Sequence, residues 1–206
     1  GKAWNRGTQI FSARPSWWKT YVPAHTSLDV WAPDVVNYNG KTWLYYSISS
    51  FGTNTSAIGL SSATSIAKGD WSDKGKVIST KAGSNDYNAI DPNFTLDASG
   101  QPYLVFGSWF SGIKIVKLDK STMKPTGSVS TIAKRSGGIE GPTVFYREGY
   151  YYLFVSIDKC CSGTSSTYKT AYGRATKITG PYVDKNGNKM TDGYSTVLDA
   201  GNARWV

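Results

Sequence analysis

The sequence predicts an all-β fold built from repeated four-stranded sheets, that is, a β-propeller. Its composition favours strands and tight turns, since aromatic residues make up 14% of the 206 residues, with eight Trp and fourteen Tyr beside 22 Gly. No stretch has a period that predicts a helix. One phrase recurs three times along the chain, which indicates a repeat architecture.

The recurring phrase predicts a β-hairpin in each copy. A glycine, taken as the turn residue, is followed three residues later by an aromatic residue and then by leucine. A proline stands seven or eight residues before the glycine, at the start of the first strand, where a missing N–H is tolerated. The pairs are Pro33 with Gly40, Pro92 with Gly100, and Pro142 with Gly149.

A second phrase adds a second hairpin to the repeat. Residues 58–75 and 172–187 share Gly, Ala-Thr, Ile, Gly, an aromatic residue, Asp-Lys and Gly in the same order. The middle copy, residues 112–127, keeps only the strand and turn. Two hairpins make four strands, which is the unit of a propeller blade, so we expect about three complete blades plus a stub. A sandwich would not repeat in this way.

The repeat also predicts where the chain is cut. Residues 3–11 match residues 70–78, so the chain is expected to open in the last strand of a blade. Residues 197–206 occupy the place ahead of a further inner strand. We therefore expect residues 1–206 to form a single catalytic propeller domain that lacks most of the first blade and the last blade. Open blade edges predict a complementary segment that closes the ring.

Charge and hydropathy exclude several classes of partner. The net charge is +9, but no run of five or more basic residues appears, so no nucleic-acid partner is expected. No apolar run approaches the roughly 20 residues of a membrane span, so no membrane partner is expected. The N-terminus lacks a signal-peptide pattern, and the chain is expected to be mature or trimmed.

The two cysteines, Cys160 and Cys161, are adjacent in the sequence. Their Cα atoms must lie about 3.8 Å apart, which is below the usual range for a disulfide. No structural disulfide is therefore expected between them. A single adjacent pair is compatible with secreted and cytosolic proteins alike, so the cysteines leave the compartment open.

Three carboxylates differ from the acidic residues that occupy turns. Asp34, Asp91 and Glu140 each lie at the proline that opens the inner strand of a blade, next to an apolar run. Inner strands line the central channel of a propeller, so the three side chains would converge on one cavity. Such a grouping of like charge is costly unless one member is protonated or a ligand is bound. The alternative is that each carboxylate only accepts hydrogen bonds from turn amides.

Converging carboxylates without His or Cys partners favour glycoside hydrolysis. One acid then protonates the leaving oxygen, and a second carboxylate activates water or attacks carbon. His25, the one histidine, has no partner at ligand spacing, so we expect a lone polar or stacking role. No Gly-x-Ser-x-Gly elbow is present. The aromatic residues suit sugar rings, although core packing explains many of them equally well.

Several motifs together resemble a known family over nearly the whole chain. They are PSWWKTYVP, LDVWAPDVV, YYSISSFGTNTSAIGL, NDYNAIDPNF, FGSWFSGIK, GGIEGP, YYYLFVSIDKCCSGTSSTY and GNARWV. In combination they are similar to the endo-α-1,5-L-arabinanases of glycoside hydrolase family 43. The resemblance implies a secreted five-bladed β-propeller that hydrolyses arabinan, the α-1,5-linked backbone of plant cell-wall pectin, and arabino-oligosaccharides, with inversion of configuration.

The resemblance also implies roles for individual residues. Glu140 of the IEGP motif is the implied general acid, and Asp91 of AIDPN is implied to raise the pKa of that acid and to orient it. Cys160 and Cys161 fall in a family loop at the rim of the channel. The implied substrate-binding residues are Trp31, Asp34, Phe51, Asn88, Ser108 and Trp109.

Two family features have no counterpart in this sequence. No residue matches the general base, an aspartate of the first blade, and the family histidine near a central ion, often taken as calcium, would lie beyond Val206. The resemblance therefore implies a structural or activating ion in the central channel, but it implies no metal ligand within this chain. A noncatalytic arabinan-binding propeller is the alternative, although Asp91 and Glu140 favour an enzyme, because a pure binder needs no tuned acid. A protein scaffold has no support beyond fold analogy.

Overall fold

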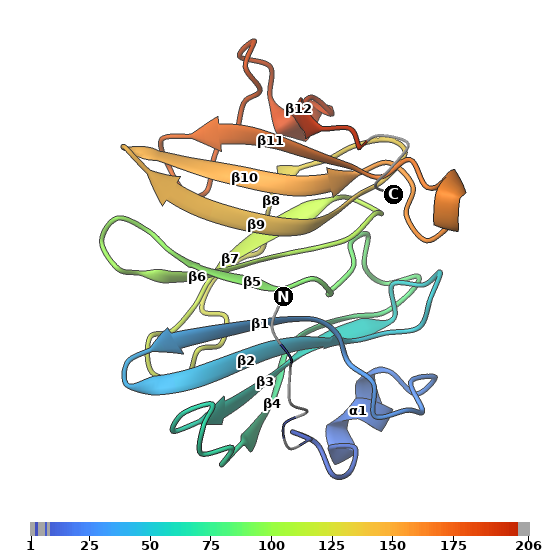
Figure 1. Ribbon diagram of the computed structural model, residues 1–206, viewed down its shortest axis with the longest axis vertical. Helices are drawn as coiled ribbons and strands as arrows, with labels where there is room; N and C mark the ends of the chain where they lie inside the picture. Colours follow the sequence, from blue (N-terminus) through green and yellow to red (C-terminus); the bar gives the residue numbers. More distant parts are fainter. Residues whose placement is uncertain (1–2, 4–6, 8, 202–206) are drawn as a thin grey trace.

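The computed structural model describes residues 3, 7 and 9–201, which form three four-stranded antiparallel sheets. The sheets are stacked along the long axis of the molecule, and the middle segment of the chain forms the middle sheet (Figure 1). In each sheet the strands are paired in chain order. The all-β prediction and the four strands per repeat are confirmed. Of the predicted strand over 3–11, residues 4–6 and 8 lie outside the described residues, and the described residues 9–11 belong to no strand. The GNARWV motif lies outside the described residues except for Gly201.

The strands have the following bounds. The first sheet contains β1 (Trp31–Tyr38), β2 (Lys41–Ile48), β3 (Ser56–Ala63) and β4 (Ser72–Thr80). The second contains β5 (Asn93–Leu96), β6 (Pro102–Phe106), β7 (Ile113–Lys117) and β8 (Ser130–Ala133). The third contains β9 (Ile139–Arg147), β10 (Tyr150–Ile157), β11 (Lys169–Ala175) and β12 (Thr196–Asp199). The remaining elements are the helix α1 (Ser16–Tyr21) and two 3₁₀ turns, η1 (Gly163–Ser165) and η2 (Met190–Asp192).

The predicted hairpin turns are present in all three sheets. Gly40 and Gly149 have φ of +73° and +83°, and each follows a residue that is also left-handed, Asn39 at +48° and Glu148 at +50°. Two consecutive left-handed residues make the two-residue turn whose twist matches that of the strands. Gly100, with φ of +76°, closes the longer turn between β5 and β6.

The prolines lie at irregular positions of the first strands. Pro92 directly precedes β5. Pro33 lies at a register shift of β1, and Pro142 lies at a register shift of β9, opposite β10 between Phe154 and Ser156. A bulge tolerates a residue without an N–H and redirects the side chains beside it. The β9 bulge therefore sets the direction of the strand immediately after Glu140.

The third repeat departs from the first in its last strand. β4 is continuous over nine residues. The matching segment of the third repeat makes only isolated bridges, from Val183 to Arg174 and Lys189, and then continues through η2 to β12. The sequence phrase at residues 172–187 thus predicted the strand β11 but not the interruption that follows it.

A short helix, α1, was not predicted. Its six residues are too few to show a helical period, and helices of this length depend on tertiary packing. Trp18 is fully buried and donates its indole N–H to the hydroxyl of Tyr46 at 3.3 Å. Among the described residues, no helix is long and apolar enough to cross a membrane.

Separate apolar clusters join the sheets. Trp43, Tyr45, Leu60 and Phe106 belong to the cluster between the first and second sheets. Val105, Ile113, Leu153 and further residues form the cluster between the second and third sheets. The first strands, β1, β5 and β9, neighbour one another across the stack. The start of each first strand is thereby brought to one shared region.

Candidate active site

A cavity of about 930 Å³ lies where the starts of the first strands meet the ends of the second strands. Each sheet contributes residues from both places. The cavity lining contains all but one of the residues that the sequence singled out as site residues. They are Trp31, Phe51, Asn88, Asp91, Ser108, Trp109 and Glu140.

Asp91 lies in the turn that leads into β5. Its φ is +57°, and its backbone N–H donates to the hydroxyl of Ser47 at 3.1 Å. Its carboxylate accepts a hydrogen bond from the N–H of Gly141 at 3.0 Å, which holds it beside Glu140. Burial raises the pKa of Asp91 to about 6, and the charge of Glu140 adds to this, against the lowering effect of the Gly141 bond.

Both carboxylate oxygens of Glu140 are held by hydroxyl groups. Ser108 Oγ donates to Oε2 at 2.7 Å, and the Tyr168 hydroxyl donates to Oε1 at 2.6 Å. Burial and the bond to Glu140 raise the pKa of Tyr168, so that its hydroxyl stays protonated as a donor. Tyr168 stands in a motif that carried the family resemblance, but it was assigned no role from sequence.

Asp34, the third carboxylate of the prediction, is not among the residues that line the cavity, whereas Asp91 and Glu140 are. Its carboxylate accepts hydrogen bonds from the N–H of Phe94 at 2.6 Å and from the side chain of Asn93 at 3.4 Å. Burial raises the pKa of Asp34 in spite of these bonds. Asp34 thus ties β1 to β5 as an acceptor of a backbone amide, which is the alternative that the sequence left open.

Exposed aromatic side chains form part of the cavity wall. Phe51, Trp109 and Phe110 are 85%, 40% and 54% exposed, and all three line the cavity. Trp109 and Phe110 are consecutive left-handed residues with φ of +56° and +47°. Gly138 makes room for Trp109, because a Cβ atom there would lie 2.7 Å from Trp109 Cζ2. Strained backbone that presents exposed aromatic groups to a cavity is typical of a binding site.

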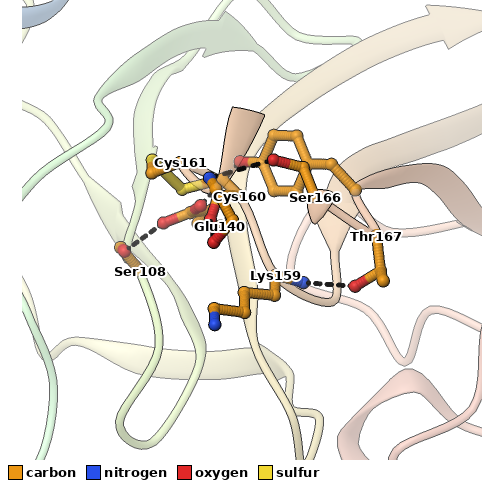
Figure 2. The surroundings of a disulfide bond; sticks show 9 residues. Ser108, Glu140, Lys159, Cys160, Cys161, Ser166 and Thr167 are labelled. Atoms are coloured by element: carbon orange, nitrogen blue, oxygen red, sulfur yellow. Dashed lines mark hydrogen bonds between the residues drawn. A yellow bond between two sulfur atoms is a disulfide. The ribbon is translucent and has the colours of Figure 1, made fainter. Parts of the chain in front are cut away.

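A disulfide joins Cys160 to Cys161, contrary to the expectation from sequence (Figure 2). Their Cα atoms are 3.8 Å apart, as adjacent residues must be. The loop between β10 and β11 accommodates the bond with Cys161 in the left-handed region, at φ of +64°. Both cysteines line the cavity. The expectation failed because the usual Cα range describes cysteines that are distant in the sequence, whereas these two are neighbours.

His25 has a structural role. It is buried, its Nδ1 is 3.0 Å from the carbonyl oxygen of Ser49, and its ring lies edge-on to Trp18 with centroids 5.5 Å apart. Within residues 9–201, no group of three or more His, Cys, Asp or Glu side chains could hold a metal ion. The ion that the resemblance implied, with no ligand in this chain, stays a prediction, and no step is assigned to an ion.

The chain is similar to glycoside hydrolases over nearly its whole length. The family model "Glycosyl hydrolases family 43" matches residues 2–205. Extracellular endo-α-(1→5)-L-arabinanase 1 of Bacillus subtilis is 58% identical over 207 residues, which cover 99% of this chain and 64% of the relative. Extracellular exo-α-(1→5)-L-arabinofuranosidase ArbA of Cellvibrio japonicus is 37% identical over 98% of this chain and 63% of the relative. The chain thus spans just under two thirds of these relatives.

Solved structures agree with the sequence comparison. An endo-arabinanase from Bacillus licheniformis superposes with a TM-score of 0.92 at 55% identity, over 97% of this chain and 69% of that chain. An α-L-arabinanase from Cellvibrio cellulosa, complexed with arabinohexaose, superposes with a TM-score of 0.91 at 37% identity, with the same coverage.

Proposed function

Because the chain belongs to glycosyl hydrolases family 43, we propose that it forms the acid side of an active site that hydrolyses α-1,5-linked L-arabinofuranosyl bonds. Glu140 is the general acid, and Asp91 orients and tunes it. The observation that carries this proposal is the shared cavity, in which the Glu140 carboxylate is held by Ser108 and Tyr168 beside a buried Asp91. The four-stranded sheets are blades of a five-bladed β-propeller, which the similarity to solved arabinanases supports.

The geometry explains how a proton is available to the leaving oxygen. Two carboxylates in one confined cavity repel each other when both are ionised, so the pair retains a proton in weakly acidic solution. The Gly141 N–H donates to the Asp91 carboxylate and so fixes its position beside Glu140. Ser108 and Tyr168 have hydroxyl groups that can each donate or accept, so they keep the acid oriented in both protonation states.

The rest of the cavity suits a sugar. Phe51, Trp109 and Phe110 present apolar faces on which furanose rings can stack. Asn88 is buried in the lining, and its Oδ1 has no hydrogen-bond partner in the part of the chain that the structure describes. Arabinan and arabino-oligosaccharides are the proposed substrates. The protein is proposed to act outside the cell, as the names of its relatives say of them.

The inverting mechanism also needs a general base, separated from the acid by roughly 6.5 to 9.5 Å. None of the described carboxylates is assigned to that role. A noncatalytic arabinan-binding protein is the competing function. The hydrogen bonds that hold the Glu140 carboxylate favour an enzyme, because a binding site has no use for an oriented proton donor.

A chimera tests this function. The chain replaces the aligned 207 residues of the Bacillus subtilis relative, and reducing-sugar release from linear arabinan is measured. We expect turnover that Glu140→Gln abolishes. A chimera that folds and binds arabinohexaose, but has no turnover with either Glu or Gln at position 140, would establish the noncatalytic alternative.

A further inference from the structure

We propose that the Cys160–Cys161 disulfide is a sugar-binding surface, against which an apolar face of an arabinofuranosyl ring lies next to Glu140. This inference rests on the proposed function. It assigns the disulfide to substrate binding rather than to the stability of the loop that carries it.

The disulfide is part of the cavity wall that also contains the acid. Cys160, Cys161, Tyr168 and Glu140 all line the cavity. Figure 2 shows the disulfide next to the Glu140 carboxylate, to which Ser108 donates its hydrogen bond. Cys160 is half-buried and Cys161 is exposed, so sulfur-bearing side chains form surface at this wall. A sugar bound for protonation by Glu140 must occupy the space beside them.

A stabilising role explains the bond poorly. Disulfides stabilise chiefly by closing a loop of the unfolded chain, and the effect grows with the length of that loop. The bond between Cys160 and Cys161 spans a sequence separation of one, so it closes almost no chain.

Other interactions already hold the loop. Lys159 and Thr167 are joined by two hydrogen bonds, from Thr167 N to the Lys159 carbonyl at 2.8 Å and from Lys159 N to Thr167 Oγ1 at 3.1 Å. Asp158, at the base of the loop, forms ion pairs with Arg135 at 2.9 Å and Lys169 at 2.8 Å. What the disulfide itself contributes is therefore the surface that it presents.

The chemistry of that surface suits one face of a furanose ring. A disulfide has no charge and no hydrogen-bond donor, and its sulfur atoms are soft and polarisable. Two thiols would instead add weak donors and ionisable groups to the wall. Together with Trp109 and Phe110 in the same lining, the disulfide gives the cavity an apolar surface for the C–H groups of the sugar. Glu140 and Asp91 would then interact with the oxygen atoms of the sugar.

Calorimetry with arabinohexaose tests the contact in the full chain. Glu140→Gln is used as the background so that no turnover occurs. The double substitution Cys160→Ser with Cys161→Ser should weaken binding about 5- to 10-fold, because apolar surface is replaced by hydroxyl groups. Ser166→Ala is the matched control. It removes an acceptor for Ser162 N within the same loop and leaves the cavity wall intact, so binding should change less than about 2-fold.

A second measurement needs no substitution at the cysteines. The rate at which dithiothreitol reduces the disulfide is followed with and without saturating arabinohexaose. A bound sugar should slow reduction at least about 5-fold, because thiol–disulfide exchange requires access to sulfur. Maltohexaose serves as the sugar control and should give no protection.

The outcomes separate this inference from the proposed function. Unchanged affinity of the double variant, or no protection by arabinohexaose, overturns the sugar-binding role of the disulfide. An equal loss of affinity in Ser166→Ala also overturns it, because the effect would then come from the loop. If the unsubstituted chain does not bind arabinohexaose, the inference falls as well, while turnover by the chimera decides the function separately.

Discussion

The hydroxyl of Tyr168 donates a 2.6 Å hydrogen bond to Glu140 Oε1, although the two residues lie 28 positions apart in the sequence. The bond connects the start of β9 to the loop that precedes β11. Ser108, in the loop between β6 and β7 of the second sheet, donates to the other oxygen of the same carboxylate. The orientation of the acid thus depends on two sheets and on the loop that carries the disulfide.

Removing the Tyr168 hydroxyl should impair turnover more than binding. Tyr168→Phe keeps the ring in the cavity wall and deletes one of the two donors to Glu140. We expect kcat in the chimera to fall about 10- to 100-fold, as for the loss of a hydrogen bond to a charged group. KM for linear arabinan should change little. Tyr194→Phe, at an exposed tyrosine outside the cavity lining, is the control, and an equal effect there would refute the positioning role of Tyr168.

Glu140→Gln should abolish hydrolysis while the fold is retained. Glutamine keeps the shape: its amide oxygen can accept from one of the two hydroxyl groups and its amide nitrogen can donate to the other, but it cannot protonate the leaving oxygen. The expected loss in kcat is about 10² to 10⁴-fold. Glu148→Gln, in the exposed turn between β9 and β10, should have normal turnover. Activity of the Glu140→Gln chimera close to that of the parent would remove Glu140 from the mechanism.

Asp91→Asn should stabilise the protein at neutral pH and inactivate it. The pKa of Asp91 is raised to about 6 from 3.8, so the folded state binds a proton more tightly than the unfolded state. The free energy of unfolding therefore falls as the pH rises from the ordinary pKa of 3.8 to the raised pKa of about 6. Asparagine has no proton to lose, so the Asp91→Asn variant does not lose this stability. We expect a gain of about 1–3 kcal/mol in the free energy of unfolding at pH 8, and little gain below pH 4.

Urea denaturation of the chain at pH 4 and pH 8 measures this difference. A stability change that is the same at both pH values would show that ionisation of Asp91 does not penalise the fold. Turnover of the Asp91→Asn chimera is measured in parallel, and full activity would refute the role of Asp91 in orienting the acid.

Local features were predictable from sequence, and contacts made by loops were not. The turns at Gly40 and Gly149 were predicted because a left-handed residue between two strands is a local requirement. The bond from the Phe94 amide to the Asp34 carboxylate could not be predicted, because a position beside a proline does not show which amide a side chain reaches. Tyr168 and the disulfide were missed because the path of the loop between β10 and β11 is set by contacts with Asp158 and Thr167.

The space that Gly138 leaves for Trp109 gives the last prediction. Gly138 has φ of +108°, and a Cβ atom there would lie 2.7 Å from Trp109 Cζ2 and 2.8 Å from the carbonyl oxygen of Asp158. Gly138→Ala must therefore displace the indole from the cavity wall or move the backbone beneath the disulfide loop. We expect arabinohexaose binding to the chain to weaken at least about 10-fold, in addition to about 1–3 kcal/mol of backbone strain.

Gly137 offers a matched control beside it. Its φ is +94°, which is equally unfavourable for alanine, but nothing lies within 4 Å of the Cβ position. Gly137→Ala should therefore lose similar stability in urea denaturation and retain its affinity for arabinohexaose in calorimetry. The difference in affinity between the two variants isolates the displacement of Trp109 from backbone strain. Equal affinities would show that the position of Trp109 does not matter for binding, and the aromatic wall would then lose its proposed role.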